Sequence, residues 1–141
     1  MTMCRRVLCL AAAGAALAVA ANAGASRTSA CAPRSIGPGS LVRGSTAGAQ
    51  CMLRAYRNGC ASAAYELSSF GVDTVATLRF QLVRRSGTCA IDVTRSFRVV
   101  PQKPRTTAAG RCTSLRRTAA ADIVAAGCRG NGIAATMSLT R

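Results

Sequence analysis

Apolar and polar residues alternate along the middle of the chain with the period of two that is typical of β-strands. The alternation runs through Ala63–Leu67, is cleanest over Ala76–Leu82, and returns over Cys89–Val99. Glycine-containing turn segments separate these three stretches, which predicts consecutive antiparallel strands. Arg95 interrupts the apolar positions of the third stretch and indicates a β-bulge or a sheet edge there.

A helical period of 3.6 residues occurs over Thr46–Asn58, where apolar and small residues share one face. That face consists of Gly48, Cys51, Met52, Ala55 and Tyr56. After Pro101, which ends the third strand, we expect a hairpin over Arg111–Cys128 and a last strand over Ile133–Leu139. The sequence therefore predicts an α+β fold in a single domain over residues 46–141. One N-terminal helix packs on an antiparallel β-meander of five or six short strands.

Residues 1–25 have the three parts of a secretory signal peptide. Arg5 and Arg6 supply the positive charge, Val7–Ala21 is apolar, and small residues follow at Ala23–Ala25. The apolar run is shorter than the roughly 20 residues that a membrane-spanning helix needs. We expect a secreted, extracellular protein, with a periplasmic or envelope-associated one as the alternative. Residues 26–45 are rich in Ser, Gly and Pro and predict a flexible arm.

The chain has 8 Cys, of which Cys4 and Cys9 fall in the predicted signal peptide. The other six predict three disulfide bonds in an oxidising compartment. None of them forms a C-x-x-C pair, which argues against a zinc or redox site. The sequence gives no other reason to expect a metal or a cofactor.

Two of the three disulfide pairings follow from the predicted elements. Cys112 and Cys128 flank the predicted C-terminal hairpin, where antiparallel pairing brings Cα atoms within disulfide range. Cys51 on the core face of the helix is expected to meet Cys89 on the core face of a strand. Those pairings leave Cys31 to bond with Cys60.

Charge and residue types restrict the chemistry. The chain has 19 Lys and Arg, 4 Asp and Glu and no His, so catalysis that depends on imidazole is excluded. Of the four carboxylates, Glu66 and Asp92 lie among polar strand positions, where we expect each to pair with a neighbouring Arg. Lys103, the only lysine, lies in a loop bounded by prolines. The chain is therefore predicted not to be an enzyme.

The basic excess is the remaining functional signal. Removal of Arg5 and Arg6 leaves 17 basic against 4 acidic residues, a net charge of +13. Such a field favours an anionic polymer as partner: a cell-wall polymer, a heparin-like chain or a nucleic acid. The expected contacts are Arg54, Arg57, Arg79 and Arg98. The chain shows no specific nucleic-acid motif, and its mature part shows no membrane-spanning stretch.

An exported protease inhibitor is the alternative function. Arg84–Ser86 and Lys103–Arg105 would present basic side chains on a loop that disulfides hold rigid. The usual character of loops favours an ordinary solvated turn for both segments.

The chain also resembles small, exported, cysteine-containing proteins of high-GC bacteria. The resemblance covers residues 51 to 139. It is carried by Cys51–Tyr56, Gly71–Thr74, Val99–Arg105 and the cysteines Cys89, Cys112 and Cys128. It implies no particular activity, ligand or catalytic residue.

We predict that the secreted protein begins at Ser26, or two residues earlier at Gly24, because small residues precede both positions. Intact-mass measurement of the protein from the culture medium checks this. A chain that still begins at Met1 and stays in the membrane fraction would contradict the prediction.

Overall fold

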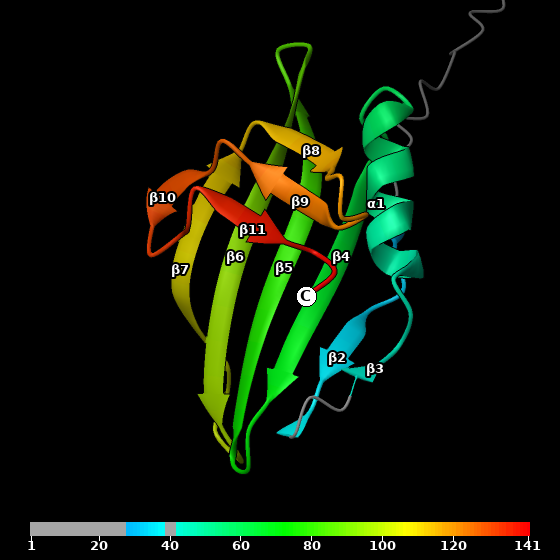
Figure 1. Ribbon diagram of the computed structural model, residues 1–141. Coiled ribbons are helices and arrows are strands. Elements are labelled where there is room, and N and C mark those ends of the chain that lie inside the picture. Colours follow the sequence, from blue (N-terminus) through cyan, green and yellow to red (C-terminus); the bar gives the residue numbers. More distant parts are fainter. Residues whose placement is uncertain (1–27, 39–41) are drawn as a thin grey trace, which may run out of the picture.

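The computed structural model describes residues 28–38 and 42–141 (Figure 1). The predicted signal peptide and its cleavage sites lie outside the described residues. In the described part, one helix accompanies strands that pair mostly antiparallel, so the α+β class is confirmed. The elements are β1 (Ser29–Ala30), β2 (Arg34–Ile36), β3 (Val42–Arg43), α1 (Ala47–Arg57), β4 (Ala63–Phe70), β5 (Thr74–Arg85), β6 (Thr88–Val99), β7 (Arg105–Cys112), β8 (Ser114–Arg117), β9 (Ile123–Ala126), β10 (Arg129–Asn131) and β11 (Thr136–Ser138).

A large sheet with the strand order β10-β7-β6-β5-β4-β2-β3 forms one layer of the molecule. Strands β4, β5 and β6 follow one another as the predicted meander, and β5 pairs with β6 over the full length of both strands. The predicted irregularity at Arg95 is confirmed, because the register between β6 and β7 shifts between Arg95 and Ser96. Thr107 is the extra residue on β7, since Arg95 lies opposite Ala108 and Ser96 lies opposite Thr106.

Three short strands lie within the predicted arm, residues 26–45. β1 and β2 both pair in parallel with β4, and β2 also pairs with β3. Cys31 lies between the two parallel segments, is 4% exposed, and donates its N–H to the carbonyl of Ala64 at 2.8 Å. The sequence did not reveal these strands because the segment lacks an alternating pattern of its own. The edge of β4 supplies its hydrogen-bond partners instead.

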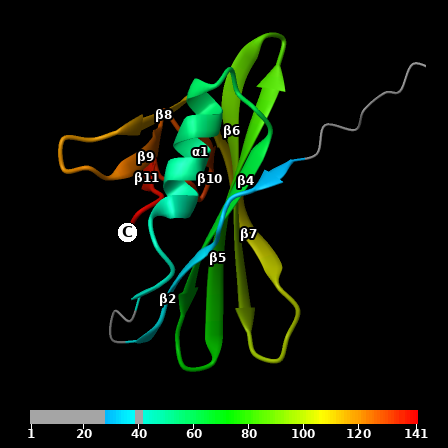
Figure 2. The same cartoon turned by 90° about the vertical axis from the view of Figure 1, so that its right-hand side faces the viewer.

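The second layer covers only one face of the large sheet, which we call the inner face (Figure 2). It consists of α1 and of a three-stranded sheet in the order β11-β9-β8, which we call the small sheet. The core lies between the layers and contains the largest fully buried side chains. These are Met52 of α1, Tyr65, Phe80, Leu82, Ile91 and Val93 of the large sheet, and Ile123 and Leu139.

The C-terminal part differs in detail from the prediction. β8 and β9 form the core of the expected hairpin, with Leu115 opposite Ala125. Cys112, however, ends β7, a strand that the sequence pattern missed. That strand, Arg105–Cys112, carries small and polar residues, so its pairing with β6 rather than its own periodicity places it in the sheet.

Three disulfide bonds link the elements, which indicates a non-reducing compartment. Cys112 bonds with Cys128, the pairing that the sequence favoured. The expected pairs Cys51–Cys89 and Cys31–Cys60 are wrong, because Cys31 bonds with Cys51 and Cys60 with Cys89. Parallel pairing of β1 with β4 brings Cys31 to the helix. Cys60 precedes the start of β4 and lies beside β5, where its sulfur contacts the carbonyl of Val83 at 3.5 Å.

Close packing of the helix on the sheet depends on Gly48. A Cβ atom at this position would lie 1.9 Å from the carbonyl oxygen of Ala32 and 2.7 Å from the ring of Tyr65. Neither neighbour is the free end of a flexible side chain, since one is backbone and the other is a ring that is 1% exposed. The small face predicted for the helix is therefore required by the distance between the layers.

We predict that Gly48→Ala lowers the free energy of unfolding. Overpacking a tight site costs about 1–3 kcal/mol, which exceeds the gain of at most about 1 kcal/mol from the better helix propensity of alanine. Urea unfolding of the oxidised protein measures the change. Arg54→Ala, at an exposed position of the same helix, serves as the control and should leave stability within about 0.5 kcal/mol. Equal stability of Gly48→Ala and the parent protein would contradict this packing.

Candidate functional site

Ion pairs neutralise much of the outer face of the large sheet, the face opposite the second layer, which no other described residues cover as a layer. Arg79 pairs with Glu66 at 3.2 Å, and Arg111 pairs with Asp92 at 2.6 Å. Arg85 lies 3.9 Å from the same Asp92 carboxylate. The expectation that Glu66 and Asp92 pair with neighbouring arginines is confirmed. The hydrogen bond from Arg111 to Asp92, followed by the attraction of its charge, raises the pKa of the Arg111 guanidinium.

The structure does not bring the four predicted polyanion contacts together. Arg54 and Arg57 are exposed on α1, in the layer that covers the inner face. Arg79 alternates with the buried Phe80 along β5 and therefore projects from the outer face. Arg98 lies opposite Val75, which is on the same face of β5 as Arg79, so Arg98 projects from the outer face as well. Arg79 is also paired with Glu66. The four arginines therefore do not form one surface that a polymer chain could contact.

Most of the positive charge has no acidic partner. Arg5, Arg6 and Arg27 lie outside the described residues, which leaves 16 of the 19 basic residues. Four of these 16, the partners of Glu66, Asp92 and Asp122, form ion pairs, so 12 form none among the described residues. Arg116 and Arg117 belong to these 12 and are exposed on β8, which contacts α1. We call Arg54, Arg57, Arg116 and Arg117 the helix-layer cations.

A groove of about 470 Å³ lies on the inner face, where the second layer leaves the sheet uncovered. Figure 1 shows β4, β5 and β6 continuing beyond β11 and the C-terminal residues. We call this hollow the inner-face groove. Its apolar lining comes from Ile36, Leu67, Ala76, Leu78 and Met137, and two guanidinium groups, those of Arg95 and Arg141, also line it.

Arg95 is a residue that the search for polyanion contacts missed. It lies on the core-facing row of β6, with Leu78 opposite it on β5 and Ala108 opposite it on β7. The signal in the sequence was the interruption of an apolar row, which predicted the bulge correctly. The sequence of β6 does not indicate how far the second layer extends over the sheet. It therefore did not show that Arg95 lines a groove.

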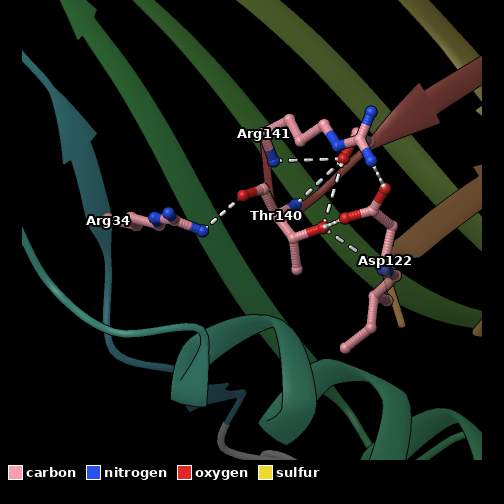
Figure 3. Close-up of polar contacts among 6 residues, drawn as sticks. Arg34, Asp122, Thr140 and Arg141 are labelled. Carbon is pink, nitrogen blue, oxygen red and sulfur yellow. Dashed lines mark hydrogen bonds and ion pairs between the residues drawn. The ribbon is translucent and has the colours of Figure 1, made fainter. Parts of the chain in front are cut away.

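A polar network fixes the C-terminal residues at one side of the groove (Figure 3). Arg34 donates a hydrogen bond to the carbonyl of Thr140, and the Thr140 hydroxyl donates to Asp122 at 3.1 Å. The same Asp122 carboxylate pairs with Arg141 at 2.5 Å. The backbone N–H of Ile123 donates to the Thr140 hydroxyl at 3.3 Å. Arg141 is therefore held in place and neutralised, whereas Arg95 is not.

Tyr65 ties the C-terminal segment to the large sheet from inside the core. Its hydroxyl donates to the carbonyl of Leu139 at 2.9 Å, and the side chain is 1% exposed. Burial raises the pKa of the Tyr65 hydroxyl, and the nearby positive charge of Arg34 opposes this effect. The hydroxyl therefore remains protonated, and able to donate, to a higher pH than it would in the unfolded chain.

The segments proposed for protease inhibition lie at opposite ends of the large sheet. Arg84 and Arg85 end β5 next to a tight turn, in which Ser86 and Gly87 both have positive φ values. Lys103 and Pro104 lie in the exposed connection between β6 and β7, and Arg105 begins β7. No contact of either segment bears on inhibition, so this function stays a prediction.

Comparisons with protein-family models, with curated proteins and with solved structures give no match for the chain. Among the described residues, no helix has the length and apolar character needed to cross a membrane.

We predict that Tyr65→Phe lowers the free energy of unfolding by about 1–3 kcal/mol, because the buried carbonyl of Leu139 loses its donor. Urea unfolding at neutral pH measures this change. In the parent protein, the raised pKa of Tyr65 contributes stability that is complete below the unfolded-state pKa of about 10 and is lost as pH rises through the folded-state pKa.

The pH dependence separates this titration from a general packing defect. Between pH 9 and 11 the parent protein should lose more stability than Tyr65→Phe, which has no hydroxyl to ionise at this position. Tyr56 is present in both proteins and cancels in the comparison. Parallel stability curves over this pH range would contradict the assignment.

Proposed function

We propose that the protein is an exported, non-catalytic module that binds an anionic polymer of the cell surface, such as a cell-wall polymer. The observation that carries the proposal is the large excess of cations that no carboxylate neutralises: 12 of the 16 described basic residues form no ion pair. Exposed cations that lack intramolecular partners are free to release counterions from a polyanion.

The helix layer is the surface that the charge distribution favours. Its four cations are all exposed and unpaired, and they lie on elements that contact one another. The outer face of the sheet holds three of the four ion pairs instead, with Glu66 and Asp92 among its arginines. A polyanion on the outer face would therefore meet carboxylates as well as arginines, which weakens the attraction.

Salt dependence tests the proposal. The logarithm of the affinity for heparin or duplex DNA should fall linearly with the logarithm of the salt concentration. Each cation that contacts a DNA phosphate contributes a slope of about −0.9. We predict that the double variant Arg54→Gln/Arg57→Gln reduces the slope for DNA by about 2 in magnitude, since it removes two contacts. Fluorescence anisotropy with a labelled duplex over a salt series measures this slope.

The matched control is Arg79→Gln/Arg98→Gln, which removes the same charge from the outer face. It should leave the slope nearly unchanged. An equal effect of the two double variants would show that net charge, not the helix layer, attracts the polymer. No binding of the parent protein to heparin or DNA in about 50 mM salt would overturn the proposed function as a whole, because electrostatic binding is strongest at low salt.

A further inference from the structure

We propose that the inner-face groove binds a small amphiphile with one anionic head group on an apolar chain, and that Arg95 pairs with the head group. This binding would be separate from polymer binding, since the groove lies on the sheet and not among the helix-layer cations. A volume of about 470 Å³ is in the range of sites that hold small molecules and is too small for a polymer.

The floor of the groove is an apolar surface that the second layer leaves open. Leu67 and Leu78 lie opposite each other on β4 and β5, and Ala76 lies on the same face two residues before Leu78. Met137 of β11 and Ile36 of β2 flank them. In most of the inner face such side chains are covered by α1 or by the small sheet. Leu67 is already buried, whereas the half-exposed Ala76 and Leu78 would gain burial from an apolar ligand chain.

Arg95 stands on this apolar face without a carboxylate. All four acidic residues of the chain are described, and neither they nor the C-terminal carboxylate of Arg141 form an ion pair with Arg95. Glu66 and Asp92 belong to the outer face, Asp122 pairs with Arg141, and Asp73 lies in the turn between β4 and β5. A cation beside an apolar groove therefore has its own charge to offer a ligand.

The bulge gives Arg95 room on both sides. The extra residue Thr107 donates its hydroxyl to the carbonyl of Arg95 at 3.4 Å, which anchors the backbone at the register shift. A second hollow of about 300 Å³, lined by Arg95, Phe97, Thr107 and Ala108, adjoins the same residue. Bulges commonly redirect a side chain next to a binding site. Arg95 thus lines both hollows.

The residues in the groove select among ligand classes. A neutral apolar molecule would remove water from the Arg95 guanidinium without replacing its hydrogen bonds, which is costly. A carboxylate or phosphate head group would accept two parallel hydrogen bonds from the guanidinium. Arg141 is already neutralised by Asp122 and offers no second full charge. The groove therefore favours a single anionic group over a dianion or a polyanion.

The test uses the oxidised, secreted protein and three probes that differ only in the head group: decanoate, decanol and decyltrimethylammonium, each below its micelle concentration. Isothermal titration calorimetry gives the affinities. We expect decanoate to bind at least tenfold more tightly than the other two. Arg95→Gln should weaken decanoate binding about tenfold and remove the preference over decanol.

The matched control is Arg98→Gln, on the same strand but on the outer face. It removes the same charge and should change decanoate affinity by less than twofold. Ala76→Trp places a large side chain at a half-exposed position of the groove and should abolish binding of decanoate. Circular dichroism and urea unfolding confirm that each variant is folded.

Three results would overturn the inference: no binding of decanoate at millimolar concentration, equal losses for Arg95→Gln and Arg98→Gln, or equal affinities for decanoate and decanol. Binding seen only with micelles or anionic vesicles would also overturn it, because the ligand would then be a lipid surface. Heparin affinity measured on the same variants keeps the two proposals apart, since Arg95→Gln should lower it no more than Arg98→Gln.

Discussion

The side chain of Tyr65 is the contact on which both layers of this protein depend. Its ring packs against Phe80 within the large sheet, with 6.3 Å between ring centroids, and against the backbone of Gly48 in α1. Its hydroxyl bonds to Leu139, which the small sheet places in the core. One aromatic residue thus sets the distance between sheet and helix and also ties the C-terminal segment to the sheet. Three disulfides reinforce this arrangement, and the buried Cys31, Cys60, Cys112 and Cys128 belong to the same core.

The shape of the second layer decides where chemistry is available. α1 and the small sheet are shorter than β5 and β6, so the inner face is covered at one end of the strands and open at the other (Figures 1 and 2). The covered end is a packed core of fully buried side chains. The open end keeps apolar residues of the same strands in contact with solvent, and the inner-face groove lies there. The alternation of apolar and polar residues determines which side chains lie on the inner face of a strand, but not which element covers them. The same pattern therefore occurs at the covered end and at the open end.

Scarce carboxylates give the charge distribution its form. Asp92 holds two arginines on the outer face, Glu66 holds one, and Asp122 holds Arg141 beside the Thr140 hydroxyl. These three acids therefore decide which cations have their charge compensated. The arginines of α1 and β8, together with Arg95, form no ion pair among the described residues and can interact with solvent or with ligands. Their availability follows from where the acids lie and not from the total charge.

Periodicity and spacing were enough to predict the α+β class, the central strands, the irregularity at Arg95, the pairing of Glu66 and Asp92 with arginines, and the bond between Cys112 and Cys128. Each of these depends on neighbours in sequence or on adjacent strands, which a sequence pattern records. The folded chain was needed to show that the N-terminal segment pairs in parallel with β4, that Arg105–Cys112 is a strand, and that Cys31 bonds with Cys51. These features join segments whose own patterns are weak, so the edge that each segment meets sets its conformation. The groove belongs to the same class, because it exists only where one layer ends over another.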